Sequence, residues 1–173
     1  MKIAVLTMAG ALVLFGARAH AEGVNDAQIA SIVVTANQVD IDAGKLAASR
    51  ATNADVKAFG ERMATDHAGV NKAATELAAK LNVTPEDNPT SQALKAGGEK
   101  NVANLQKLSG AAFDKAYIDH EVAYHEQVLE AVDKTLIPSA KNAELKALLV
   151  KVRPAFVTHR DQAKKIRASL SGK

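Results

Sequence analysis

Cysteine is absent from all 173 residues of the chain. Its absence excludes disulfide bridges, thiolate metal ligands, thiol enzymes and a lipoprotein attachment site. Aromatic residues make up only 3% of the sequence, and tryptophan is missing. Alanine, in contrast, recurs throughout. This composition favours helices packed closely together over sheets.

Long apolar runs are missing after the first residues. Lys2 precedes an apolar run over residues 3–15, and Ala19-His20-Ala21 has the small-x-small pattern of a signal peptidase site. We interpret residues 1–21 as a signal peptide cleaved after Ala21, and expect residues 22–173 to form one periplasmic domain without a stable membrane span. Removing Lys2 and Arg18 from 22 basic residues leaves 20 against 19 acidic ones, which argues against nucleic-acid binding.

Apolar residues recur at steps of three and four over several segments, which predicts amphipathic helices. Asn25 with Gln28 resembles a capping box, Asn53 and Asn142 are typical N-caps, and Pro138 with Ser139 ends a run. The expected helices cover residues 26–51, 54–81, 113–136 and 143–170, with a weaker one over 90–109 that Gly97 and Gly98 loosen. Pro154 is expected to kink the last helix.

The spacing of these segments predicts an all-α fold. The short link at 52–53 makes the first two helices an antiparallel hairpin, and the last two long helices form another. Residues 82–110 then form a long helical crossover between the second and third helices, giving a ferritin-like four-helix bundle. The height of one hairpin relative to the other does not follow from the sequence.

Each long helix carries a ligand-type side chain on the face expected to point inward. These residues are Asp40, His67, Glu121, His125 and His159. A buried carboxylate or imidazole is costly unless it is paired, hydrogen-bonded or coordinated, and helix bundles commonly build metal sites from facing helices. Met63, one turn before His67, would suit copper, but a core gap-filler is the more common role. His120 points sideways and His20 lies in the signal peptide, so neither is counted.

The sequence lacks the motifs that several enzyme classes require. A ferritin-type di-iron centre needs Glu-x-x-His twice, and the residues three before His67, His125 and His159 are Ala64, Val122 and Phe156. No Ser-His-Asp order, Gly-rich phosphate loop or zinc-protease motif is present. The chain is therefore not expected to be an enzyme.

Four blocks resemble the secreted bacterial family called domain of unknown function 4142. They are VDIDAGKLA (39–47), VKAFGERMATDH (56–67), LSGAAFDKAYIDHEVAYHE (108–126) and RPAFVTHRDQA (153–163). The resemblance implies a ferritin-like four-helix fold and places the family's recurrent histidines at His67, His125 and His159. It also places an Asp-His pair at Asp66-His67 and an acidic position at Asp40. It does not extend to His120 or Glu121.

The leading hypothesis is a non-enzymatic periplasmic protein that binds a transition metal through His67, His125 and His159, with Asp40 or Glu121 completing the shell. Imidazole with carboxylate suits zinc, copper or iron, and spacing alone does not choose among them. The alternative is an envelope structural or stress-response protein whose metal-free polar core fixes helix register. A third hypothesis is a di-metal oxidoreductase with altered ligands.

Overall fold

The computed structural model describes residues 23–172, so the predicted signal peptide lies outside the described range. All regular secondary structure in this range is helical: α1 (Asp26–Arg50), α2 (Ala54–Lys80), α3 (Pro89–Leu105), α4 (Gly110–Ala131), the π-helical turn η1 (Val132–Leu136), α5 (Ile137–Ser139) and α6 (Ala143–Ser171). The all-α prediction is confirmed. Over residues 23–172, no helix is both long enough and apolar enough to cross a membrane.

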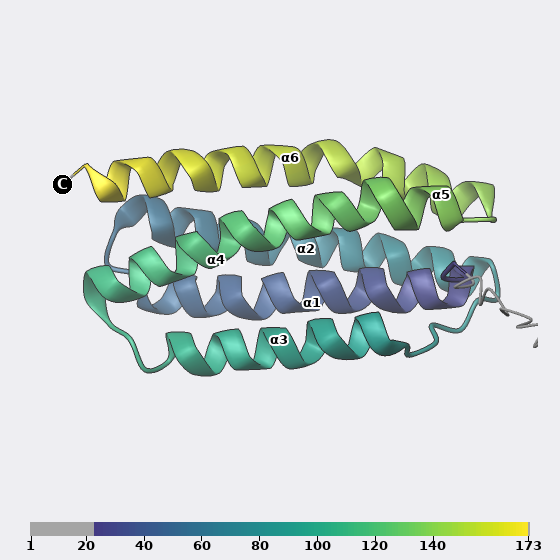
Figure 1. Cartoon of the computed structure of the whole chain (residues 1–173), viewed down its shortest axis with the longest axis horizontal. Coiled ribbons are helices and arrows are strands. Elements are labelled where there is room, and N and C mark those ends of the chain that lie inside the picture. Colours follow the sequence, from purple (N-terminus) through teal and green to yellow (C-terminus); the bar gives the residue numbers. More distant parts are fainter. Residues whose placement is uncertain (1–22, 173) are drawn as a thin grey trace, which may run out of the picture.

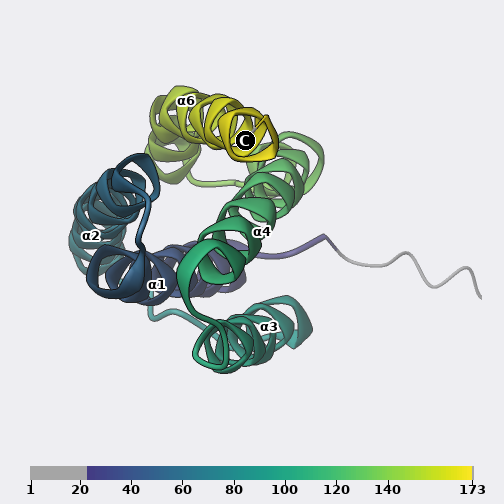
Figure 2. The same cartoon turned by 90° about the vertical axis from the view of Figure 1, so that its left-hand side faces the viewer.

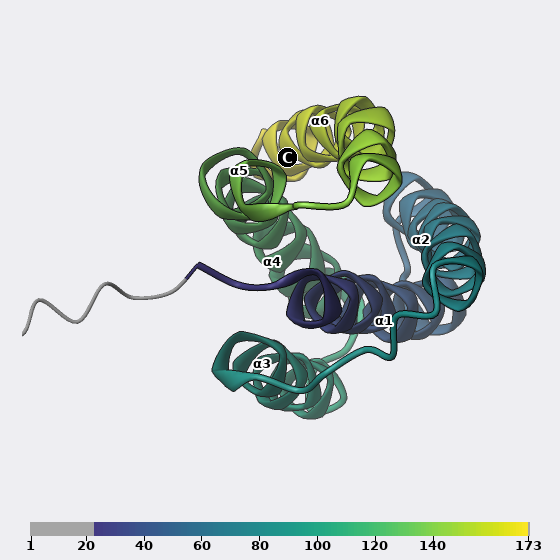
Figure 3. The ribbon, with the colours of Figure 1, turned by 90° about the vertical axis from the view of Figure 1, so that its right-hand side faces the viewer.

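The long helices run side by side along one axis (Figure 1). Seen from the end, α1, α2, α4 and α6 surround a common interior, and α3 lies outside them against α1 and α4 (Figure 2). From the opposite end, the connection after α2 passes beneath α1 to reach α3 (Figure 3). The crossover predicted between the second and third helices is therefore a fifth long helix packed on the outside.

The predicted N-caps begin their helices. Asn25 Oδ1 accepts a hydrogen bond from the Gln28 amide at 2.8 Å, and the Gln28 side chain accepts one from the Asn25 amide, which completes the capping box. Asn53 accepts from the amides of residues 55 and 56, and Asn142 accepts from those of residues 144 and 145. Side-chain oxygens thus satisfy amide donors that the first helical turns leave free.

The crossover helix differs from its prediction. α3 ends at Leu105, where residue 109 was expected, because the Arg50 guanidinium binds the carbonyls of Gln106 and Leu108 at 3.0 and 2.8 Å and holds the chain in a turn. The helix also runs unbroken through Gly97 and Gly98. A Cβ added to Gly98 would lie 2.5 Å from a Val39 methyl carbon, so this glycine lets α3 approach α1 closely.

The helix that carries Glu121 and His125 is longer than predicted at both ends. It starts at Gly110 and, through η1 and α5, continues to Ser139, so Pro138 does not end it. In η1 the Ile137 amide bonds the carbonyl of Val132, five residues back. Pro138 then falls in the first turn of α5, where a missing amide donor costs little. Similarly, α6 runs through Pro154, an exposed position.

Close backbone contact joins α1 to α2. A Cβ on Gly44 would lie 2.8 Å from the Gly60 carbonyl oxygen, and one on Gly60 would lie 2.8 Å from Ala47 Cβ. Neither position has room for a side chain. These two glycines set the distance between the helices that carry Asp40 and His67.

Two apolar clusters fill the ends of the interior. One contains Ala43, Ala47, Phe59, Met63, Phe113, Tyr117 and Ile166, and the other contains Ile29, Ile32, Ala74, Val132, Leu145 and Leu149. Along each of α1, α2, α4 and α6, a predicted site residue lies between the members of the two clusters or at their border. The core therefore has an apolar region at each end and a polar layer between the two.

Two buried or half-buried carboxylates fix the heights of the helices. Asp114, at the start of α4, accepts hydrogen bonds from the Thr52 amide, the Thr52 hydroxyl and the Asn53 amide at 3.0, 2.6 and 2.8 Å. At the other end, Asp26 accepts from the amides of Lys141 and Asn142, both at 2.9 Å. These contacts bind each hairpin to the other at both ends, and supply the relative height that the sequence left open.

Candidate metal centre

Three imidazoles from three helices meet in the polar layer. His67 of α2, His125 of α4 and His159 of α6 have ring centroids 5.2–5.6 Å apart. Their residues are at most 2% exposed. Asp40 of α1 and Glu121 of α4 are also buried beside them. The structure therefore brings together all five residues that the sequence singled out.

The tautomer of His67 is set by Asn37 on α1. The Asn37 amide nitrogen donates to the Val33 carbonyl at 2.8 Å, so its oxygen is the atom that faces His67 Nδ1 at 2.7 Å. Because that oxygen can only accept, Nδ1 must carry the proton. The lone pair is then on Nε2, for which no residue within 23–172 provides a hydrogen bond.

His125 is held by its own helix. Its Nδ1 lies 3.0 Å from the backbone carbonyl of Glu121, one turn earlier. A carbonyl oxygen only accepts, so Nδ1 is the protonated nitrogen here too. Nε2 has the lone pair and finds no hydrogen-bond partner in the described part of the chain.

His159 uses the opposite nitrogen. Its Nε2 donates to the Asp66 carboxylate at 2.9 Å, and Nδ1 has no hydrogen-bond partner among the described residues. Asp66 also accepts from Arg62 Nε at 3.1 Å. Burial alone would raise the pKa of Asp66, but the hydrogen bonds from His159 and Arg62, together with the Arg62 charge, lower it, so the carboxylate stays ionised and orients the ring. All three imidazoles thus have one nitrogen fixed as a donor and the other free.

The free nitrogens are not protonated at neutral pH. Burial, followed by the neighbouring His125 and His159, lowers the pKa of His67 to about 2. Burial lowers the pKa of His125 to about 4, against the opposing effect of its bond to the Glu121 carbonyl. The pKa of His159 is also lowered by burial, despite its contact with Asp66. The rings therefore present neutral lone pairs, which is the form that binds metals.

The spacing suits a single ion. One nitrogen of each ring lies within 4.8 Å of the corresponding atom of the other two. Three points within that limit have a common centre no farther than 4.8 Å/√3, about 2.8 Å, from each of them. Zinc and similar ions bind imidazole nitrogen at about 2.0–2.1 Å. A contraction of less than 1 Å per ligand would complete the shell.

Asp40 is better placed than Glu121 to add an oxygen ligand. Asp40 Oδ2 lies 3.5 Å from His67 Nε2, the nitrogen left free, whereas Glu121 Oε2 lies 3.5 Å from His125 Nδ1, the nitrogen already engaged. Asp40, Glu121 and His125 also form a group with ligand atoms within 4.8 Å. Burial and then the charge of Glu121 raise the pKa of Asp40, and burial raises that of Glu121 to about 8. Both carboxyls therefore disfavour a free negative charge.

Sequence reasoning missed Asn37, and it reached Asp66 only through the family resemblance. Asn37 precedes Asp40 by three residues, which places both on one helix face, and this spacing could have marked it. Met63 lies in the apolar cluster at the α1–α2 turn, as a gap-filler would. His120 lies outside the imidazole cluster and stacks on Tyr124 at 5.6 Å between centroids.

These features define a class: an all-helical protein with a buried cluster of three neutral imidazoles and an adjacent carboxyl pair. The family model described as Domain of unknown function (DUF4142) matches residues 15–166, and the chain belongs to that family. The resemblance seen in the sequence is thereby confirmed. Comparison with curated proteins and with solved structures gives no significant match.

Proposed function

We propose that this is a non-enzymatic, ferritin-like periplasmic protein that binds one transition-metal ion. His67 Nε2, His125 Nε2 and His159 Nδ1 would supply three ligands and Asp40 a fourth. The proposed periplasmic location follows from the leader pattern in residues 1–21. The ferritin-like part follows from the four helices, α1, α2, α4 and α6, that supply the ligands across a common interior.

One observation carries the proposal. In each ring one nitrogen donates to a fixed acceptor, which is an amide oxygen, a backbone carbonyl or a carboxylate, and the other has no partner among the described residues. Metal-bound histidines are oriented by just such second bonds, which fix the tautomer and raise ligand basicity. A purely structural network would be expected to use both nitrogens, because an unpaired buried nitrogen carries a desolvation cost.

The proposed ligands favour a metal ion of intermediate softness. Three imidazoles and a carboxylate suit zinc, copper or iron, whereas calcium and magnesium prefer shells of oxygen. Binding would also relieve the carboxyl pair, since a dication next to Asp40 favours its ionised form.

Metal analysis tests the proposal. The mature protein, produced without a histidine tag, is expected to retain about one ion per chain, whereas the His67→Ala, His125→Ala, His159→Ala triple variant loses it. His120→Ala is the matched control, because His120 is partly buried on the same helix as His125 but outside the cluster. An equal, low metal content in wild type and triple variant, with no change in melting on adding zinc or copper, would instead support the metal-free structural role.

A further inference from the structure

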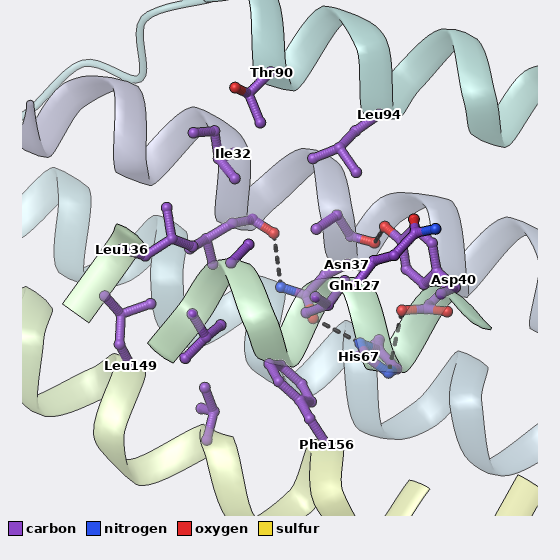
Figure 4. Close-up of a pocket in the computed structure, with 17 residues that line it drawn as sticks. Ile32, Asn37, Asp40, His67, Thr90, Leu94, Gln127, Leu136, Leu149 and Phe156 are labelled. Atoms are coloured by element: carbon purple, nitrogen blue, oxygen red, sulfur yellow. Dashed lines mark hydrogen bonds and ion pairs between the residues drawn. The ribbon is translucent and has the colours of Figure 1, made fainter. Parts of the chain in front are cut away.

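A largely apolar cavity of about 200 Å³ lies next to the imidazole cluster (Figure 4). Its walls come from α1, α2, α3, α4, η1 and α6, and include Ile32, Leu94, Val128, Leu136, Leu149 and Phe156. The cavity lies on the side of the polar layer that faces the cluster of Ile29, Val132 and Leu149. The metal proposal does not use this space.

The inner end of the cavity is formed by two of the proposed metal ligands. His67 and Asp40 both line it, and Phe156 stacks on the His67 ring at 5.4 Å with an interplanar angle of 7°. A molecule that filled the cavity would therefore touch the polar layer at one end and aliphatic side chains along the rest of its length.

Apart from His67 and Asp40, the buried polar side chains of the lining are already engaged, and the exposed Thr90 and Gln127 complete its polar groups. Asn37 bonds both His67 and the Val33 carbonyl, and the Tyr124 hydroxyl donates to the Ala36 carbonyl at 3.0 Å. No charged side chain other than Asp40 lines the cavity over residues 23–172. Away from Asp40, an ionic ligand would thus lose its hydration without compensation, whereas an uncharged apolar one would gain burial.

A surface groove leads to the cavity. The groove lies between α3 and α4, has a volume of about 510 Å³, and shares Thr90, Leu94, Tyr124 and Gln127 with the cavity. Thr90 and Gln127 are exposed, whereas Tyr124 is buried. The crossover helix α3 therefore borders the entrance, and a ligand could pass between Leu94 and Gln127.

The π-helical turn η1 forms part of the cavity wall. Val132 and Leu136 begin and end η1, and both line the cavity. A π-helical turn accommodates an extra residue in an α-helix and is frequent at functional sites. Here it shapes the wall opposite His67.

We propose that this cavity binds a small uncharged apolar molecule, of about the size of toluene, with one end against His67 and Asp40. The size follows from volume, since a dry cavity of about 150 Å³ holds benzene. The position next to a bound ion rests on the function proposed above, but binding within the cavity does not.

The first test uses toluene and the metal-free mature protein. Toluene is expected to raise the melting temperature and to shift the methyl NMR signals of Val132, Leu136 and Leu149. Ala131→Leu fills the cavity and should weaken toluene binding at least about tenfold. Ala123→Leu makes the same change at an exposed position of the same helix and should leave binding unaltered.

Val128→Phe is a second filling variant at a partly exposed lining position, and far-UV circular dichroism checks that each variant is folded. Absence of toluene binding to wild type would overturn the proposal. So would equal binding by the folded Ala131→Leu and Ala123→Leu variants.

The second test addresses the position relative to the ion. In protein loaded with Cu(II), the proton signals of bound toluene should be broadened by the nearby paramagnetic ion, and removing the copper should restore them. If toluene bound the copper-loaded protein and its proton signals were not broadened, the placement beside His67 would be wrong. Failure to load copper would count against the metal proposal alone, and the metal-free titration would still decide whether the cavity binds apolar molecules.

Discussion

Each imidazole of the cluster depends on one hydrogen-bond acceptor. For His67 that acceptor is Asn37, whose own orientation is fixed by the Val33 carbonyl. Without it, the ring could rotate or change tautomer and turn the protonated nitrogen toward the cluster. Under the proposed function, Asn37 would therefore contribute to metal binding although it is not a ligand.

Replacing Asn37 with alanine is expected to lower zinc affinity about 10- to 100-fold, the usual loss when the partner of a metal-bound histidine is removed. The measurement is a competition titration against a chelating dye. Gln38→Ala is the control, because Gln38 is exposed and, within the described part of the chain, its side chain bonds only Asp42. Equal affinities in the two variants would show that Asn37 does not orient His67.

Glu121 gives a pH-dependent stability. Its pKa is about 8 in the folded protein against an ordinary value of 4.5, so the folded state holds more protons between these values than the unfolded state. Stability therefore falls as pH rises through this window. Below about pH 6.5 the histidines act in the opposite direction, since they are neutral when folded and protonated when unfolded.

In metal-free protein, the free energy of unfolding of wild type minus that of Glu121→Gln should therefore decrease as pH rises from 5 to 8. Urea denaturation at several pH values measures this difference, which cancels the common contribution of the histidines. Glu61→Gln, at an exposed position of α2, should give a difference that does not change over the same window. If the difference between wild type and Glu121→Gln did not change with pH, the Glu121 carboxyl of the folded wild type would be ionised over the whole range.

At the scale of helices, the distance between α1 and α2 decides whether Asp40 reaches His67. Gly44 and Gly60 bring the two backbones together four residues after Asp40 and seven residues before His67. A methyl group at either glycine must push the helices apart, because the nearest atoms belong to backbone or to Cβ atoms that do not rotate away.

Gly60→Ala is expected to destabilise the protein by about 1–3 kcal/mol, as overpacking does, and to weaken metal binding. Gly69→Ala is the matched control in the same helix, since no atom of residues 23–172 beyond the adjacent residues and backbone of that helix lies within 4 Å of the added Cβ. It should stabilise by about 0.5–1 kcal/mol through helix propensity. Thermal melting and zinc titration of both variants measure the two effects, and a similar result for both would contradict the close-contact argument.

The sequence predicted elements better than it predicted their ends. The apolar periodicity identified the long helices and predicted that His67, His125 and His159 point inward, because such periodicity arises where one face of a helix is buried. The end of α3 depends on Arg50, more than fifty residues earlier, and Pro138 is accommodated by a π-helical turn. The first effect is not local, and the second depends on a rare backbone form that apolar periodicity does not indicate, so neither boundary could be derived from the pattern alone.

The same limit applies to the site. The inward residues could be named from their own helices, but their common height could not. That height depends on Asp114 and Asp26, which contact backbone amides 62 and 115 positions away in sequence. A carboxylate that binds distant amides looks like any other surface acid when the sequence is read alone.

At the scale of the whole molecule, Asp114 is the contact that aligns α4 with the α1–α2 hairpin. It lies about two turns before Glu121 and receives three hydrogen bonds while buried. Asp114→Ala should cost about 1.5–3 kcal/mol, since hydrogen bonds to a charged group are lost, and should also weaken metal binding. Chemical denaturation and zinc titration measure both.

Asp119→Ala is the control in the same helix. Among residues 23–172 its only ion pair is with exposed Lys115, so the expected loss is below about 1 kcal/mol and metal affinity should not change. If Asp114→Ala lost stability but kept full metal affinity, the relative height of the hairpins would be held by other contacts.

The adjacent residues Asp66 and His67 give the site a further property. One turn of α2 carries the proposed ligand His67 and also holds the ring of a second proposed ligand, His159, through Asp66. A displacement of that turn would move the His67 ring away from the cluster and would also break the hydrogen bond that holds the His159 ring. An ion in this cluster would therefore leave in a single all-or-none event, without passing through a long-lived state in which only one histidine has let go.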